Sequence, residues 1–442
     1  MNQFSLLATR RFLPLFLAQF LGALNDNIYR FALVIFVTYR LAGATGMDAG
    51  TLVVASGGVF ILPFFLFSAW AGQLADKLEK SRLIRFIKAV EIALMGLGAV
   101  GFWLASVPLL FLVLFLMGTH SAFFGPLKYG ILPQHLAPAE LTGGNALIQM
   151  ATYIAILCGT LLGGSLAALE HAGPLAVVGC VLGVAVLGFR AACAVPPAPA
   201  PQPDLHIDWR PDRATLRLLR LALTSRPLLV LTLLNSWFWF QGATFLSLVP
   251  TYGKDLLKAS EGAVTALTAA FTVGIGMGSL LCEWLSRRRV ELALVPPAAL
   301  GLSLCALDIA WRGVPPLPPE TLGVAALWTT PAAWRLFLDL VGIGAFGALY
   351  VVPLSAALQA AAPEAIRSRV IAALNVMNAA FMVCSAVFTL ALFGVGATQP
   401  QIFGATALLN LGVMGAGVAA LPEFRERMRA RFGKKHGAPA DT

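Results

Sequence analysis

A cluster of polar residues interrupts a long apolar stretch near the start of the chain. The segment FLGALNDNIYRF contains Asn25, Asp26, Asn27 and Arg30. Asp26 and Arg30 are four residues apart, so both lie on one face of a helix. A charge at the centre of a bilayer costs about 2.5–3.5 kcal/mol on insertion scales, and such residues default to functional sites. Two interpretations are open: the pair binds the ionic groups of a ligand, or it staples helices together.

Polar residues also interrupt other apolar runs, and together they form the candidate binding set. Beyond the first apolar stretch, this set comprises Glu91, which lies three residues after Lys88, and His120, Lys128, Trp237, Trp239, Gln241 and Asp339. The two tryptophans come from the segment WFWF, which supplies apolar surface. Asp26, Glu91 and Asp339 are each candidates to carry a coupling proton or to help hold sodium. The alternative is transport without a coupling ion, running downhill as the transported molecule is consumed.

The composition requires long apolar helices to position these residues. The chain is 58% hydrophobic and 12% charged, with a mean hydropathy of +0.81, whereas soluble domains are about 25% charged. About 20 apolar residues suffice for one spanning helix. We therefore predict an all-α polytopic membrane protein with twelve transmembrane helices, at 12–39, 51–73, 83–105, 107–128, 142–168, 173–191, 227–252, 262–285, 290–311, 334–358, 368–394 and 401–421.

The positive charges indicate the topology. With the N-terminus in the cytoplasm, 25 of the 31 Lys and Arg fall at cytoplasmic ends and loops. This bias is the positive-inside rule, and it predicts that both termini are cytoplasmic. The positive-inside rule therefore accounts for the net charge of +10, and we expect no nucleic-acid partner.

A long polar break divides the twelve spans into two six-helix halves. We expect an N-terminal half at 1–191, a Pro/Ala-rich linker at 192–226, a C-terminal half at 227–424 and a basic cytoplasmic tail at 425–442. Within the linker, arginines and leucines alternate at helical spacing after residue 211. This pattern predicts a short basic amphipathic helix, which either lies on the inner leaflet or is a solvated linker helix.

The segment GQLADKLEKSR, after span 2, resembles the signature of the major facilitator superfamily. Gly72, Asp76, Lys77 and Arg82 match the pattern, and Glu79 stands where the family usually has Gly. A degenerate copy after span 8 has Glu283 and Arg287 as its best matches. The resemblance implies two six-helix halves and a conformational latch that unlocks during alternating access. It also places spans 1, 4, 7 and 10 along a central cavity.

Several longer stretches are similar to one family within this superfamily, the bacterial lysophospholipid transporters and the related transporter domain fused to acyltransferases. They are FLGALNDNIYRFALVI, RFIKAVEIALM, FFGPLKYGILPQHL, NSWFWFQGATFL and FGALYVVPLSAALQ. The resemblance implies that the protein flips lysophospholipid, with lysophosphatidylethanolamine as the expected lipid, from the outer to the inner leaflet of a bacterial inner membrane. The ammonium would then meet Asp26 or Glu91, and the phosphate Arg30 or Lys128.

Two alternatives remain beside this hypothesis. One is a major facilitator exporter of hydrophobic drugs. The other is a membrane-embedded acyltransferase, suggested by HLAPAE at 135–140. In that segment Glu replaces the expected Asp, so we predict no enzymatic activity. We expect no cofactor and no metal, and a functional link to a separate acyltransferase that consumes the lipid.

Overall fold

The computed structural model describes residues 3–40, 49–167, 169, 173–222, 225–286, 289–312 and 322–432. These residues form helices and no β-strand, apart from one isolated bridge between Ala259 and Leu322. The all-α prediction is therefore confirmed. The chain divides into two compact units, Met1–Thr224 with Gln359–Cys384, and Ser225–Leu358 with Ser385–Thr442.

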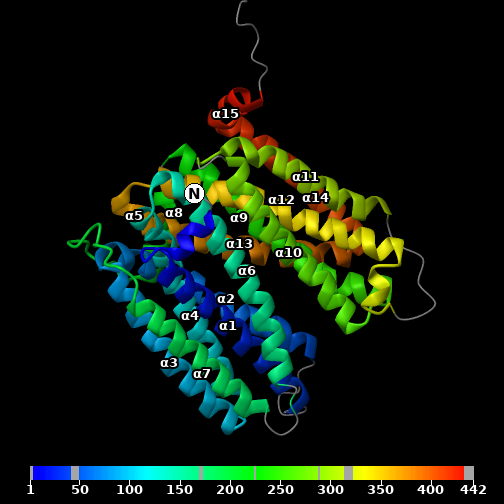
Figure 1. The fold of residues 1–442 in the computed structure, drawn as a ribbon, viewed down its shortest axis with the longest axis horizontal. Coiled ribbons are helices and arrows are strands. Elements are labelled where there is room, and N and C mark those ends of the chain that lie inside the picture. The colour runs from blue at the N-terminus through cyan, green and yellow to red at the C-terminus, as the bar shows by residue number, and fades with distance from the viewer. Residues whose placement is uncertain are drawn as a thin grey trace, which may run out of the picture. The chain divides into compact units, whose positions relative to one another are not determined.

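The first unit packs its helices around α1, which carries the polar segment. Helix α1 contacts α6 and α7, while α3 lies against α4 and α7, and α2 against α4 (Figure 1). Its helices are α1 (Leu13–Arg40), α2 (Ala49–Lys77), α3 (Lys80–Trp103), α4 (Val107–Gly130), α5 (Leu132–His135), α6 (Leu141–Ala167), α7 (Gly173–Cys193) and α8 (Pro211–Ala222), with the short helices η1 (Gln3–Ala8), η2 (Pro138–Glu140) and η6 (Glu364–Ile366) and the first part of α13 (Arg367–Gly394).

The second unit has a core in which α11 lies along α14 (Figure 1). Its helices are α9 (Arg226–Thr251), α10 (Glu261–Ser286), α11 (Val295–Arg312), most of α12 (Pro331–Ala361), α14 (Gln399–Ala420) and α15 (Pro422–Phe432), with the short η3 (Tyr252–Leu256), η4 (Leu292–Leu294) and η5 (Ala325–Leu327).

Twelve helices in the described part of the chain have 18 residues or more, which matches the predicted number of spans. Eleven of them are long and apolar enough to cross a membrane by length and composition. The other is α3, whose first twelve residues include Lys80, Arg82, Arg85, Lys88 and Glu91. These charges lower its hydropathy, although its length of 24 residues is enough for about 36 Å of helix.

Glycines allow the closest helix crossings. A Cβ on Gly274 of α10 would stand 2.1 Å from the carbonyl oxygen of Val341, and one on Gly344 of α12 would stand 2.2 Å from that of Phe271. Only a residue without a side chain lets two backbones approach so closely. The glycines of the segment GIGAFG, at 342–347 in α12, therefore serve close helix packing.

Candidate functional site

Helix α1 is fixed in its register by a close crossing with α6. A Cβ on Gly159 would stand 2.7 Å from the carbonyl oxygen of Leu24, and one on Gly163 would stand 2.4 Å from that of Ile28. The Asn27 amide turns back to donate to the carbonyl of Ala23 on its own helix at 2.8 Å. The close crossing holds the polar segment of α1 in a fixed orientation.

A fully buried charged cluster lies between α1, α3 and α4. Lys88 Nζ is 2.7 Å from Glu91 Oε2, and Asn25 Nδ2 donates to Glu91 Oε1 at 2.8 Å. His120 Nε2 lies 3.3 Å from Glu91 Oε2. Lys88 and Glu91 are 0% and 1% exposed, so removing either one would leave the other buried without its ion-pair partner.

Two further residues, Phe124 and Gly22, lie against the Lys88 ammonium. Its Nζ lies 4.9 Å from the centre of the Phe124 ring, in cation–π geometry. On the α1 side, a Cβ at Gly22 would stand only 2.2 Å from Nζ. Gly22 is thus required for the cluster, which we call the Lys88–Glu91–His120 cluster.

Asp26 is adjacent to this cluster but is not paired with a cation. The Ser121 hydroxyl donates to Asp26 Oδ2, and Asp26 Oδ1 is buried with no hydrogen-bond partner in the described part of the chain. By contrast, Glu91 is paired with Lys88, and Asp339 with Arg312. Of the three acids singled out in the sequence, Asp26 keeps the most free acceptor capacity.

Arg30 and Lys128 contact aromatic rings, and neither forms an ion pair with a described residue. The Arg30 guanidinium lies 5.3 Å from the Phe31 ring centre, and Lys128 Nζ 5.0 Å from that of Tyr129. Both side chains are partly buried, and both interact electrostatically with Asp26. No salt bridge of 4.0 Å or less joins Asp26 to Arg30, so the stapling interpretation lacks its expected contact.

The signature segment forms a second site at the end of α2. Asp76 is fully buried and accepts hydrogen bonds from the backbone N–H groups of Ser368 and Arg369 at 3.1 and 3.3 Å, and from Arg369 Nε at 3.0 Å. Asp76 thus faces both a helix N-terminus and a cation, an arrangement that stabilises its negative charge.

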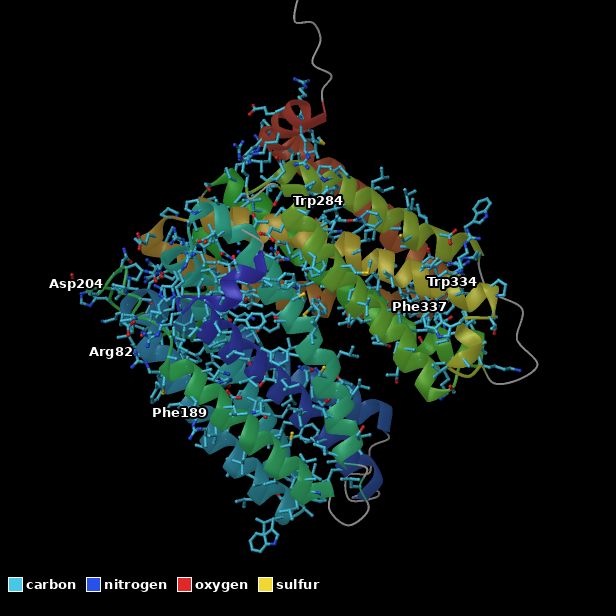
Figure 2. The ribbon with its side chains drawn as sticks, viewed as in Figure 1. Arg82, Phe189, Asp204, Trp284, Trp334 and Phe337 are labelled. Carbon is cyan, nitrogen blue, oxygen red and sulfur yellow. The ribbon has the colours of Figure 1, made fainter. Side chains whose placement is uncertain are left out.

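The other residues of this segment differ in how they contribute. A Cβ on Gly72 would stand 2.7 Å from Ala372 Cβ, so Gly72 lets α2 approach α13. Lys77 ends α2 and is half-buried. Arg82 is exposed (Figure 2), and its Nε lies 3.8 Å from the Glu79 carboxylate. Within this segment, Gly72 and Asp76 are the residues whose described contacts reach α13.

Glu79, the departure from the family pattern, caps α3 and holds the linker. Its carboxylate accepts the N–H groups of Ser81 and Arg82, and that of Ala198 at 2.7 Å. Burial of Glu79 opposes ionisation, but the hydrogen bonds from the Ala198 N–H, from the hydroxyl and N–H of Ser81 and from the Arg82 N–H together outweigh it and lower the pKa of Glu79. The residue therefore replaces the usual turn glycine with a charged cap.

The degenerate copy of the signature, with Glu283 and Arg287, belongs to the second unit. Glu283 lies half-buried in α10 and its carbonyl accepts a hydrogen bond from Ser286 Oγ. Arg287 lies outside the described residues.

The aromatic segment of α9 is tied to its own unit by neutral hydrogen bonds. Trp237 stacks on Phe240 at 4.6 Å and donates to Asn410 Oδ1 at 3.0 Å. Trp239 is half-buried and lies edge-on to Phe238. Gln241 is 1% exposed, and neither atom of its amide has a partner in the described residues. Its free amide suits a polar ligand group or a water.

Asp339 belongs to an ion-pair network at one end of α11 and α12. Arg312 pairs with both Asp308 and Asp339, and Arg335 pairs with Asp308. The Asp339 carboxylate is therefore already engaged by Arg312, and no contact among the described residues joins it to the polar groups of α9.

The sequence interpretation missed several partners. Ser121 follows His120 directly and is the hydrogen-bond donor to Asp26. Asn145 and Gln359 form a reciprocal buried amide pair, with Gln359 Nε2 donating to Asn145 Oδ1 at 2.7 Å. Both amides lie in apolar runs, so the rule that flagged Gln241 would have found them too.

The HLAPAE segment is engaged in structural contacts. Arg11 forms two hydrogen bonds with the Glu140 carboxylate, and His135 Nε2 lies 3.3 Å from the carbonyl oxygen of Pro197. The two side chains thus contact other residues instead of each other.

Curated relatives resemble the chain over most of its length. It is 27% identical over 356 residues to the lysophospholipid transporter LplT of Serratia proteamaculans, covering 80% of this chain and 81% of that protein. It is 28% identical over 366 residues to LplT of Cronobacter sakazakii, with the same coverage. The LplT of Escherichia coli O157:H7 is 27% identical over 401 residues, covering 90% and 92%.

Solved structures share the fold. The transporter FucP in its outward conformation matches with a TM-score of 0.70 and 16% identity, over 94% of this chain and 98% of FucP. The human organic anion transporter MFSD10 matches with a TM-score of 0.68 and 19% identity, over 92% and 99%. The family description "Major Facilitator Superfamily" matches residues 15–386. The chain is a multi-pass membrane protein that belongs to the Major Facilitator Superfamily.

Proposed function

We propose that this protein transports lysophospholipid across the membrane. The observation that carries the proposal is the resemblance to relatives named lysophospholipid transporters over four fifths of the chain. The membership in a transporter superfamily and the buried charged groups of α1, α3 and α4 support it. A lysophospholipid combines a charged headgroup with one acyl chain, so its transporter needs both ionic groups and apolar surface.

The geometry around Asp26 suits a zwitterionic headgroup. The free oxygen of Asp26 is available to accept from an ammonium, while Arg30 and Lys128 keep their donors for a phosphate. Charge-assisted hydrogen bonds of this kind are worth about 1.5–3 kcal/mol each. The Lys88–Glu91–His120 cluster contributes by positioning Asn25 beside Asp26, because Asn25 is held by Glu91. Trp237, Trp239 and Gln241 would meet the neutral parts of the lipid.

We place both termini in the cytoplasm of a bacterium and the protein in its inner membrane, following the distribution of Lys and Arg. Transport runs from the outer to the inner leaflet, with lysophosphatidylethanolamine as the preferred lipid, by alternating access. The contact of Asp76 with α13 would latch one state, and its release would accompany the change. A separate acyltransferase then consumes the lipid, and no cofactor takes part.

The test is uptake of lysophosphatidylethanolamine labelled in its headgroup by bacterial spheroplasts that express the protein. We expect uptake well above the empty-vector control. Uptake equal to the control, combined with increased efflux of a hydrophobic dye, would instead identify a drug exporter.

A further inference from the structure

Helix α8, in the linker, lies across the contact between α2 and α13. Its residues Ala214 and Leu218 are buried in one cluster with Ala69 of α2 and with Ala372 and Ala373 of α13. The same two helices meet at Gly72 and at Asp76. Helix α8 therefore packs on both partners of the Asp76 contact at once.

The chain leading into α8 is held to the same contact. Gln202 N–H donates to the Asp76 carbonyl at 2.9 Å, and the Arg369 guanidinium donates to Gln202 Oε1. The Asp208 N–H donates to Gln73 Oε1 at 2.8 Å. These bonds leave α8 little freedom to move unless the contact between α2 and α13 also changes.

The opposite face of α8 is exposed and carries both arginines and large apolar groups. Leu216 is 50% exposed, and Arg213 and Arg220 on the same helix are exposed. Trp209, two residues before α8 begins, is 63% exposed. The face also includes Asp212 and Arg217, which is paired with Asp208 at 2.8 Å. Its net charge is positive, and a charged face that includes Trp and Leu is typical of a helix at a membrane surface.

The level of α8 along its neighbours agrees with that location. Ala69 precedes the end of α2 at Lys77 by eight residues, which is about 12 Å at 1.5 Å per residue. Ala372 follows the start of α13 at Arg367 by five residues, or about 8 Å. Under the proposed topology both ends are cytoplasmic, so α8 lies at headgroup depth. Trp209 packs against Trp70 of α2 with ring centres 5.9 Å apart, and Trp is enriched at this depth.

The packing of α8 against its neighbours is incomplete. A cavity of about 310 Å³ lies between α8 and its neighbours, lined in part by Gln73, Leu218, Leu221 and Arg369. An incompletely packed helix gains less from burial than a close-packed one. A favourable interaction on the outer face of α8 would therefore add to its hold on α2 and α13.

We propose that the outer face of α8 binds the anionic phospholipid headgroups of the cytoplasmic leaflet, through Arg213 and Arg220 with Trp209 and Leu216 inserted beside them. Arginines near an anionic membrane surface are attracted to its phosphate groups. Bound in this way, α8 clamps α2 against α13 and stabilises the state in which Asp76 contacts Arg369. The proposal relies on the topology proposed above and requires no particular transported lipid.

Site-directed labelling tests the proposal. In a variant with the exposed Cys193 and Cys384 replaced by serine, Leu216→Cys is reconstituted in phosphatidylcholine nanodiscs with or without 30% phosphatidylglycerol. The reagent is an uncharged polyethylene-glycol maleimide. We expect labelling at position 216 to be at least fivefold slower with phosphatidylglycerol. The combined change Arg213→Gln and Arg220→Gln should remove that difference.

Two controls separate specific binding from other effects. Asp204→Cys, in the same linker and exposed (Figure 2), should label at one rate in both lipids. Arg10→Gln with Arg429→Gln removes two exposed arginines elsewhere and should leave the effect at position 216 intact. Equal rates at position 216 in both lipids would show a solvated linker helix and overturn the proposal. Equal slowing at position 204 would overturn it too. Because labelling does not require transport, these results stand apart from the uptake test.

Discussion

The two units bury different kinds of polar group. In the first unit, spanning helices hold ionisable side chains, with the Lys88–Glu91 pair fully buried and Asp26 next to it. In the second unit, the buried polar groups of α9 are neutral amides, hydroxyls and an indole, as in the hydrogen bond from Trp237 to Asn410. Its ion pairs around Arg312 are more exposed, at 12–59% of the side-chain area.

The difference indicates a division of labour. Charge recognition requires preorganised charges in a low-dielectric setting, and among the described residues the buried acidic and basic side chains lie in the first unit. Neutral groups and aromatic rings suit the glycerol and acyl parts of a lipid. We infer that headgroup specificity resides in the first unit and that the second contributes mainly apolar and neutral polar surface.

The largest expected effect comes from breaking the buried pair. Glu91→Gln leaves the Lys88 ammonium buried without a counter-charge, which costs about 3–5 kcal/mol. The matched change in the second unit, Asp339→Asn, should cost less, because Arg312 retains Asp308 and is partly exposed. Thermal unfolding in detergent measures both. Recovery of stability in Lys88→Met with Glu91→Leu would support the ion-pair explanation, whereas equal losses for Glu91→Gln and Asp339→Asn would remove the contrast between the units.

The next effect concerns transport rather than folding. Asp26→Asn keeps the shape of the side chain but removes the charge, so the initial rate of lysolipid uptake should fall about 10–100-fold, the equivalent of one charged hydrogen bond. The unfolding temperature should be unchanged. Gln241→Leu, in the second unit, should alter uptake by about twofold to tenfold, because a neutral hydrogen bond is worth about 0.5–1.5 kcal/mol. Normal uptake by Asp26→Asn would make Asp26 a structural residue.

A smaller effect is expected at the two copies of the signature. Asp76→Asn weakens the contact with the start of α13 by about 1 kcal/mol, so the maximal transport rate should change about fivefold while the half-saturating lipid concentration stays the same. Glu283→Gln, in the degenerate copy, should change neither. A pure loss of affinity in Asp76→Asn would count against a latch.

The smallest effect is at the cap of α3. Glu79→Gln should cost about 1 kcal/mol at neutral pH, the usual value of a helix cap. The pKa of Glu79 is lowered from 4.5 in the fold, so its contribution is fully present above about pH 4.5 and is lost as the pH falls through the lower folded value. Unfolding of both proteins from pH 7 to pH 3 should therefore converge at the acid end. A constant difference at every pH would show that the charge of Glu79 is irrelevant.

Much of the fold followed from local sequence. Hydropathy and length predicted the twelve long helices, because each span must satisfy its backbone groups within itself. The same rule placed the polar residues on spanning helices. Their ends differ by a few residues, as at α2, which continues to Lys77 instead of ending at residue 73, since a helix can extend beyond the apolar core.

The partners of each polar residue did not follow from sequence. Helical spacing suggested that Asp26 pairs with Arg30, but the structure gives Asp26 the hydroxyl of Ser121 from another helix. Likewise Glu91 of α3 accepts a hydrogen bond from Asn25 of α1. Such contacts depend on how α1, α3 and α4 are rotated about their axes, and glycines such as Gly22 set that rotation through close approach.

The central claim is that Asp26 binds the ammonium of the lipid headgroup. It is tested most directly by competition between lysophosphatidylethanolamine and lysophosphatidylglycerol of the same acyl chain, measured for the wild type and for Asp26→Asn. The account predicts that the wild type prefers the lipid with the amine, and that Asp26→Asn reduces this preference about tenfold, which corresponds to about 1.4 kcal/mol. A preference that is unchanged in Asp26→Asn would contradict it.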